Sequence, residues 1–220
     1  MTPTWIQLWV ERQAMDPAAW TAGHTLQLLL GGDAPAKVGR ADLWELAVDG
    51  GSDDVTQRFD VWIRSSNLFL NPNRDRGVVL EGVDPLPGPA CASVVTVDRG
   101  GAESRAHALT LGHALGGKWR VRRGTVWTLV WPPERAADVE KLAERAAWAK
   151  RRSSGLLVNA ESQDAVVLVG RWTCPALPEG APAGNGGTTQ AQAPAATPAP
   201  ASAQAEPQAE TEPDPGGKDG

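Results

Sequence analysis

Histidines and cysteines could bind a metal ion or serve as nucleophiles, but the 220-residue chain has only three histidines and two cysteines. His107 and His113 are six residues apart, so on a helix they point to different faces and do not share a metal ion. Cys91 and Cys174 have no paired spacing around them, which favours free thiols. We therefore expect no metal site, no cofactor and no catalytic pair built on these residues.

Other patterns that carry chemistry are also missing from the sequence. The run Gly116-Gly117-Lys118 is too short for a phosphate-binding loop, and no nucleophile elbow or paired-cysteine motif occurs. Asn71 and Asn159 are expected as turn residues, since asparagine hydrogen-bonds its own backbone in turns. We expect no catalytic site. A small enzyme with an unrecognised site is the alternative, and in that case changes at His107 or Asp98 would abolish an activity without loss of stability.

Charge divides the chain into two parts. From residue 179 onward there are six acids, one base and no aromatic residue, a composition that predicts a disordered tail over 179–220. The remaining residues hold 20 acids and 20 bases, so they lack the basic surplus of a nucleic-acid binder. The basic cluster at 118–123 is interpreted as a solvated strand face, and the one at 150–152 as a helix C-terminus. The start of the chain does not resemble a signal peptide and no long apolar run occurs, so we expect a cytoplasmic protein without a membrane span.

The elements that would position any site come from an internal repeat. Residues 38–46 match 121–129 at an offset of 83, and residues 24–28 match 107–111 at the same offset. Residues 64–82 match 152–170 at an offset of 88, with nine identities in 19 positions. Near the start of each copy, residues 10–12 match 97–99 at an offset of 87. Several blocks in the same order indicate a tandem duplication.

Each copy predicts the order β-α-β-β-α-β, the ferredoxin-like pattern of an α+β protein. In the second copy we expect a strand at 93–97, a helix at 102–115 and a helix prepared by the prolines at 132–133, followed by a strand at 165–169. Residues 118–131 are interpreted as two strand segments joined by a turn or bulge at Gly124. In the first copy, the corresponding strands are expected at 5–10, 37–48 and 77–80, with helices starting at Asp16-Pro17 and spanning 55–66.

The predicted domains are a first unit at 1–86, a second at 90–174 and the tail at 179–220. A unit of about 85 residues is marginal alone, so the two copies are expected to share an interface as a pseudo-dimer, face on face or edge on edge. Ten tryptophans supply much of the apolar area for this packing. Trp44 and Trp127 are equivalent in the repeat and are expected in equivalent, packed environments.

Each copy resembles the PurS-type small subunit of phosphoribosylformylglycinamidine synthase. The resemblance lies in the strand segments 38–46 and 121–129, in the turns at 68–72 and 156–160, and in the Asp16-Pro17 helix entry. It covers residues 1–172. The usual chain of that family is a single unit, the second copy has Ala160 in place of the proline of the turn, and the charged tail is foreign to the family.

The resemblance implies a non-catalytic accessory role in de novo purine biosynthesis. The chain would bridge the ATP-using synthetase subunit and the glutaminase subunit, as a monomeric pseudo-dimer or a higher homo-oligomer. Arg40, Asn71, Arg123 and Asn159 are the candidate contacts with these partners. The alternative is a regulatory module that binds a small ligand between the two units.

Overall fold

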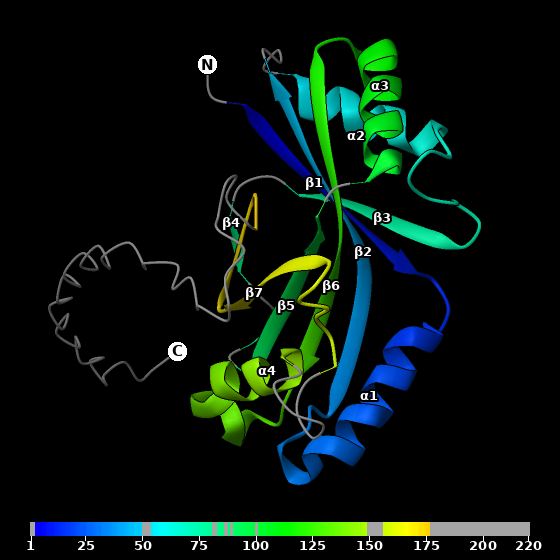
Figure 1. The fold of residues 1–220 in the computed structure, drawn as a ribbon. Helices are drawn as coiled ribbons and strands as arrows, with labels where there is room; N and C mark the ends of the chain where they lie inside the picture. The colour runs from blue at the N-terminus through cyan, green and yellow to red at the C-terminus, as the bar shows by residue number, and fades with distance from the viewer. Residues whose placement is uncertain are drawn as a thin grey trace, which may run out of the picture. The chain divides into compact units, whose positions relative to one another are not determined.

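The described part of the chain is a mixed α+β structure in which four α-helices pack on a six-stranded antiparallel sheet (Figure 1). The computed structural model describes residues 3–49, 54–80, 83–85, 88, 90–99, 101–148 and 156–176, all within one compact unit that ends at Thr189. The tail predicted at 179–220 and the basic cluster at 150–152 lie outside the described residues. No helix among the described residues is long and apolar enough to cross a membrane.

The same order of elements occurs twice along the chain. The first half contains β1 (Thr4–Arg12), α1 (Pro17–Leu30), β2 (Lys37–Asp49), α2 (Val55–Ser65) and β3 (Asp75–Leu80). The second half contains β5 (Cys91–Asp98), α3 (Ala102–Leu115), β6 (Lys118–Val130), α4 (Val139–Ala147) and β7 (Gln163–Val169). Short 3-10 helices span Gly31–Asp33 and Pro133–Asp138, and the pair β4 (Val83–Pro85) and β8 (Arg171–Thr173) forms a separate small sheet.

The two halves meet edge on edge in one sheet of order β3-β1-β2-β6-β5-β7. Strands β2 and β6 pair antiparallel along their whole length, from Lys37 opposite Val130 to Asp49 opposite Lys118. In this register Arg40 lies opposite Trp127, and Trp44 lies opposite Arg123. Since Arg40 matches Arg123 and Trp44 matches Trp127 in the repeat, each arginine faces the tryptophan of the other half across the centre of the sheet.

The expected break of residues 118–131 at Gly124 is wrong, because β6 runs through it as one strand of 13 residues. Gly124 is needed there for a different reason. A Cβ atom at this position would lie 1.9 Å from the carbonyl oxygen of Thr96 in β5, so only glycine allows the two strands to approach. Each half thus contributes three strands to the main sheet, and one long strand lies between its two α-helices where the expected β-α-β-β-α-β order has two.

The structural register also corrects two of the repeat offsets. Glu11 of β1 pairs with Ala41 and Arg76, and Val97 of β5 pairs with Gly124 and Asp164, which are the residues that match Ala41 and Arg76 in the repeat. Glu11 and Val97 are therefore equivalent, so β1 and β5 match at an offset of 86. The expected offset of 87 is wrong by one residue, and such a slip puts every side chain on the opposite face of a strand. Helices α1 and α3 are both 14 residues long and align at an offset of 85, so His24 and His107 are not equivalent.

The helices begin and end for identifiable reasons. Asp16 caps α1 by accepting hydrogen bonds from the N–H groups of Ala18 (2.8 Å) and Ala19 (3.4 Å), and Pro17 occupies the first helical position, as the sequence predicts. The helix prepared by Pro132-Pro133 starts later than expected, because its first turn is the 3-10 helix Pro133–Asp138.

One face of the sheet, here called the helix face, carries two apolar cores that each draw on both halves. Leu26 of α1 packs with Leu142 of α4 over Val94 of β5, in the core of the second half. Leu111 of α3 packs with Phe59 of α2 in the core of the first half. Figure 1 shows the result, with α1 and α4 at one end of the sheet and α2 and α3 at the other. Each half therefore completes the core of the other.

The opposite face of the sheet, here called the strap face, is covered in part by the chain that follows β7. This C-terminal strap (residues 170–176) places Trp172 over the sheet with 1% of its surface exposed. Trp172 packs edge-on against Trp9, with ring centroids 4.4 Å apart, and joins a core with Leu43 and Val126. Beyond residue 170 the strap lies outside the matched repeat blocks, so the repeat does not predict its burial.

Candidate functional site

Arg40 and Arg123 occupy equivalent places beside the β2–β6 junction. The guanidinium of Arg40 lies 5.8 Å from the ring centroid of Trp127, and that of Arg123 lies 5.3 Å from the ring centroid of Trp44. Each arginine also pairs with an acid near the start of a helix, Arg123 with Glu103 at 2.8 Å. Trp44 is buried and Trp127 is half-buried, so both tryptophans are packed as expected, but their environments differ in burial.

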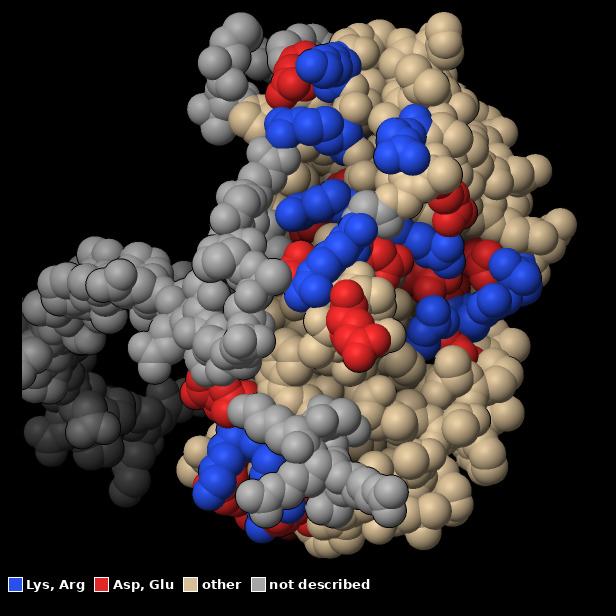
Figure 2. Space-filling model, viewed as in Figure 1, with Lys and Arg blue, Asp and Glu red and all other residues tan. Residues whose placement is uncertain are grey.

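Arg40 connects α1 to the sheet. It pairs with Asp16 at 3.3 Å and with Asp42 at 2.5 Å. Since Asp16 also caps α1, the arginine fixes the start of the helix against β2. Acidic and basic side chains interleave in a band across the middle of this view of the molecule (Figure 2).

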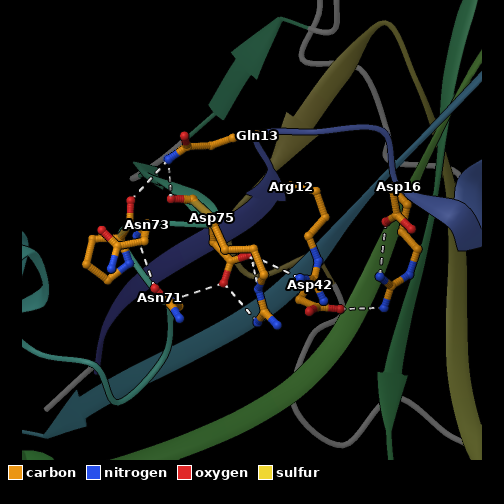
Figure 3. A network of polar contacts seen from close by, with 10 residues as sticks. Arg12, Gln13, Asp16, Asp42, Asn71, Asn73 and Asp75 are labelled. Carbon is orange, nitrogen blue, oxygen red and sulfur yellow. Dashed lines mark hydrogen bonds and ion pairs between the residues drawn. The ribbon is translucent and has the colours of Figure 1, made fainter.

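A second group of polar contacts surrounds Asp75 at the start of β3 (Figure 3). Asp75 is 6% exposed and accepts hydrogen bonds from Arg74 (3.1 Å) and from the Asn71 N–H (3.1 Å), with Arg12 at 3.5 Å. Burial disfavours the charged carboxylate, but these hydrogen bonds and the charges of Arg74 and Arg12 outweigh it, so the pKa of Asp75 lies below its ordinary value. Gln13 donates to the carbonyl of Asp75 at 3.0 Å and closes the network.

Asn71 and Asn159 act as turn residues in the same way. The Oδ1 of Asn71 accepts the Asn73 N–H at 3.0 Å, and that of Asn159 accepts the Glu161 N–H at 3.1 Å. These local bonds shape the turns that lead into β3 and β7, the two outer strands of the main sheet. The structure brings Asn71 into the network of Figure 3, while Asn159 lies in the turn before β7, the strand at the other edge of the sheet.

A pocket of about 760 Å³ opens where β1 leaves the side of β2 and the chain turns into α1. Its floor is a row of small residues on three neighbouring strands of the strap face, Gly39, Thr128 and Ser93. The β1–α1 segment, including Met15 and Trp20, and the side chain of Trp9 form its walls. The floor combines residues of both halves, in a volume that suits a small organic molecule.

Two polar atoms at this pocket have no hydrogen-bond partner among the described residues. The hydroxyl of Ser93 is fully buried and unpaired, and the indole N–H of Trp9 is also buried and unpaired. Buried polar groups in folded proteins are nearly always satisfied, so both point to an interaction that the described part of the chain does not supply. Sequence reasoning missed Ser93 because it reads as one residue of a buried apolar strand.

A buried polar cluster lies further along the strap face. Glu45 is 0% exposed, pairs with Arg122 at 2.6 Å and accepts hydrogen bonds from Gln7 and from the Ala176 N–H, both at 2.8 Å. Gln7 in turn accepts the indole N–H of Trp172. This cluster pairs a buried carboxylate with a cation and holds the strap on the sheet, so we assign it a structural role.

The histidines and cysteines do not form a site in the described part of the chain, where no cluster of three or more potential metal ligands occurs. His107 is buried between Trp44 and Phe69, with both ring centroids 4.9 Å away, and burial lowers its pKa. His24 is exposed and stacks on Trp20. Burial raises the pKa of the Cys91 thiol, which makes it a poor nucleophile at neutral pH.

The geometry thus presents one pocket with unpaired polar atoms and two equivalent arginine–tryptophan pairs. Comparison of the chain with models of protein families, with curated proteins and with solved structures finds no match to any of them.

Proposed function

We propose that the chain is a non-catalytic accessory subunit of phosphoribosylformylglycinamidine synthase, acting in the cytoplasm in de novo purine biosynthesis. In this proposal two PurS-type, ferredoxin-like units arose by duplication and form a covalent pseudo-dimer. The chain would bridge the synthetase and glutaminase subunits.

The observation that carries this proposal is the β2–β6 pairing. It joins the two copies of the motif that resembles the family, residues 38–46 and 121–129, in one antiparallel register. The two turns that resemble the family's turn lead into β3 and β7, the outer strands of the main sheet. Sheet edges offer backbone hydrogen-bonding groups to another chain, which suits a bridging subunit.

Co-purification of the tagged chain from its own cells, with mass spectrometry of the eluate, tests the proposal. Both partner subunits should be recovered. Arg123→Glu should reduce their recovery at least several-fold, while Arg64→Glu, at a side chain that is 72% exposed on α2, serves as the control. Elution of the chain alone would contradict the bridging role.

The pocket favours a second function, the binding of a small regulatory ligand between the two halves. Its floor combines Gly39 of the first half with Thr128 and Ser93 of the second half. A ligand that spans this floor would stabilise the folded chain and raise its melting temperature without any partner protein. Such a ligand could also regulate an accessory subunit, so the two functions are compatible.

A further inference from the structure

We infer that the pocket binds a small zwitterion, an α-amino acid with an apolar side chain. This inference rests on the second function proposed above and adds the chemical class of the ligand. It comes from the charged and polar groups around the Gly39–Thr128–Ser93 floor and from the positions that the strand register gives them.

Two opposite charges flank the floor. Lys37, Gly39 and Ala41 alternate along β2 on the strap face, and Glu11 lies beside Ala41 in the neighbouring strand. Residues two apart on one face of a strand are separated by about 7 Å, so Gly39, the end of the floor nearest to β1, lies between the Lys37 and Glu11 positions. Both side chains line the pocket, and both are exposed.

Neither of these charges is neutralised within the described part of the protein. The other two cations of the pocket lining are paired, Arg40 with Asp16 and Asp42, and Arg12 with Asp75. Lys37 and Glu11 form no ion pair with any described residue. A cation on one side of the floor and an anion on the other complement a ligand that carries a carboxylate and an ammonium group.

The floor and walls match the rest of such a molecule. The buried Ser93 hydroxyl can donate or accept a hydrogen bond, and the buried Trp9 N–H can only donate. Gly39 has no side chain, so the pocket reaches the backbone of β2 beside Thr128. Met15 and Trp20 are large apolar side chains at the wall, 73% and 63% exposed, and they would cover an apolar ligand side chain.

Three matched probes test the inference on the full chain. L-Phenylalanine carries both charges, 3-phenylpropionate lacks the ammonium group, and phenethylamine lacks the carboxylate. Isothermal titration should show millimolar or tighter binding of phenylalanine, and each single-charge probe should bind at least about tenfold more weakly, since one charged contact is worth a factor of about that size.

Two charge-removing variants assign the contacts. Glu11→Gln should erase the preference for phenylalanine over 3-phenylpropionate and leave the preference over phenethylamine. Lys37→Met should erase the preference for phenylalanine over phenethylamine and leave the preference over 3-phenylpropionate. Ser93→Ala should weaken phenylalanine about tenfold without lowering the melting temperature of the free protein, because the hydroxyl has no partner in it. Gly39→Val should fill the floor and abolish binding.

The outcomes separate the ligand class from the pocket itself. If a single-charge probe binds as tightly as phenylalanine and Gly39→Val abolishes its binding, the zwitterion inference is overturned while the pocket remains a ligand site. If the preferences persist in both charge variants, the assignment of Lys37 and Glu11 is wrong and the inference fails. If none of the three probes binds the wild-type chain, both the inference and the ligand site proposed under the second function are contradicted.

Discussion

Replacing Gly124 with alanine tests the central packing of the sheet. The added Cβ would lie 1.9 Å from the carbonyl oxygen of Thr96, 3.0 Å from its carbonyl carbon and 3.2 Å from the Cα of Val97. All three atoms belong to the backbone of β5, so no side chain can rotate away and the two strands must separate. Overpacking costs about 1–3 kcal/mol even where side chains can adjust. We therefore expect Gly124→Ala to lose at least about 3 kcal/mol of unfolding free energy.

Urea denaturation followed by tryptophan fluorescence measures this loss, and thermal denaturation should show a drop of about 6–12 °C, since 1 kcal/mol corresponds to about 2–4 °C for a chain of this size. Gly39→Ala is the matched control on the paired strand β2. Its Cβ would lie 3.6 Å from the Cβ of Thr128, an ordinary contact, so its stability should change by less than about 1 kcal/mol. Equal stability of the two variants would refute the close approach of β5 and β6 at Gly124.

Three further predictions concern buried side chains. Trp172→Ala should lose about 3–5 kcal/mol in urea denaturation, whereas Trp20→Ala, at a residue 63% exposed, should lose less than about 1 kcal/mol; similar losses would contradict the burial of the strap. In the folded chain the lowered pKa of His107 keeps its ring neutral, whereas in the unfolded chain the same histidine takes up a proton as the pH falls below about 6.5. Wild-type stability should therefore decrease as the pH falls. His107→Leu should narrow the difference between the urea midpoints at pH 7 and pH 5.5, and an unchanged difference would argue against a buried neutral histidine. The Cys91 thiol should react with a disulfide reagent only after urea is added, and fast reaction in the folded chain would contradict its burial.

Local signals in the sequence predicted most elements. Asp16 and Pro17 define the start of α1 because a cap and a proline act within one turn. The helix expected at 55–66 is α2, whose buried residues Val55, Phe59 and Ile63 recur at helical spacing. The asparagine turns at Asn71 and Asn159 also follow from local hydrogen bonding.

Features that depend on contacts between distant residues could not be predicted. Glycine in a β-branched segment indicates a turn or bulge, but Gly124 serves a close approach to Thr96, 28 residues earlier. The match of Val10 with Val97 is one residue out of register, because both strands contain similar apolar residues on their two faces. The pocket and the strap join residues from both halves, and no spacing in the sequence reveals that Ser93 and Gly39 lie in one row.

The accessory role is tested most directly by glutamine-dependent synthesis of phosphoribosylformylglycinamidine with purified synthetase and glutaminase subunits. The proposal predicts that product forms from glutamine only when this chain is added, while ammonium salts support synthesis without it. Equal glutamine-dependent rates with and without the chain would contradict the account.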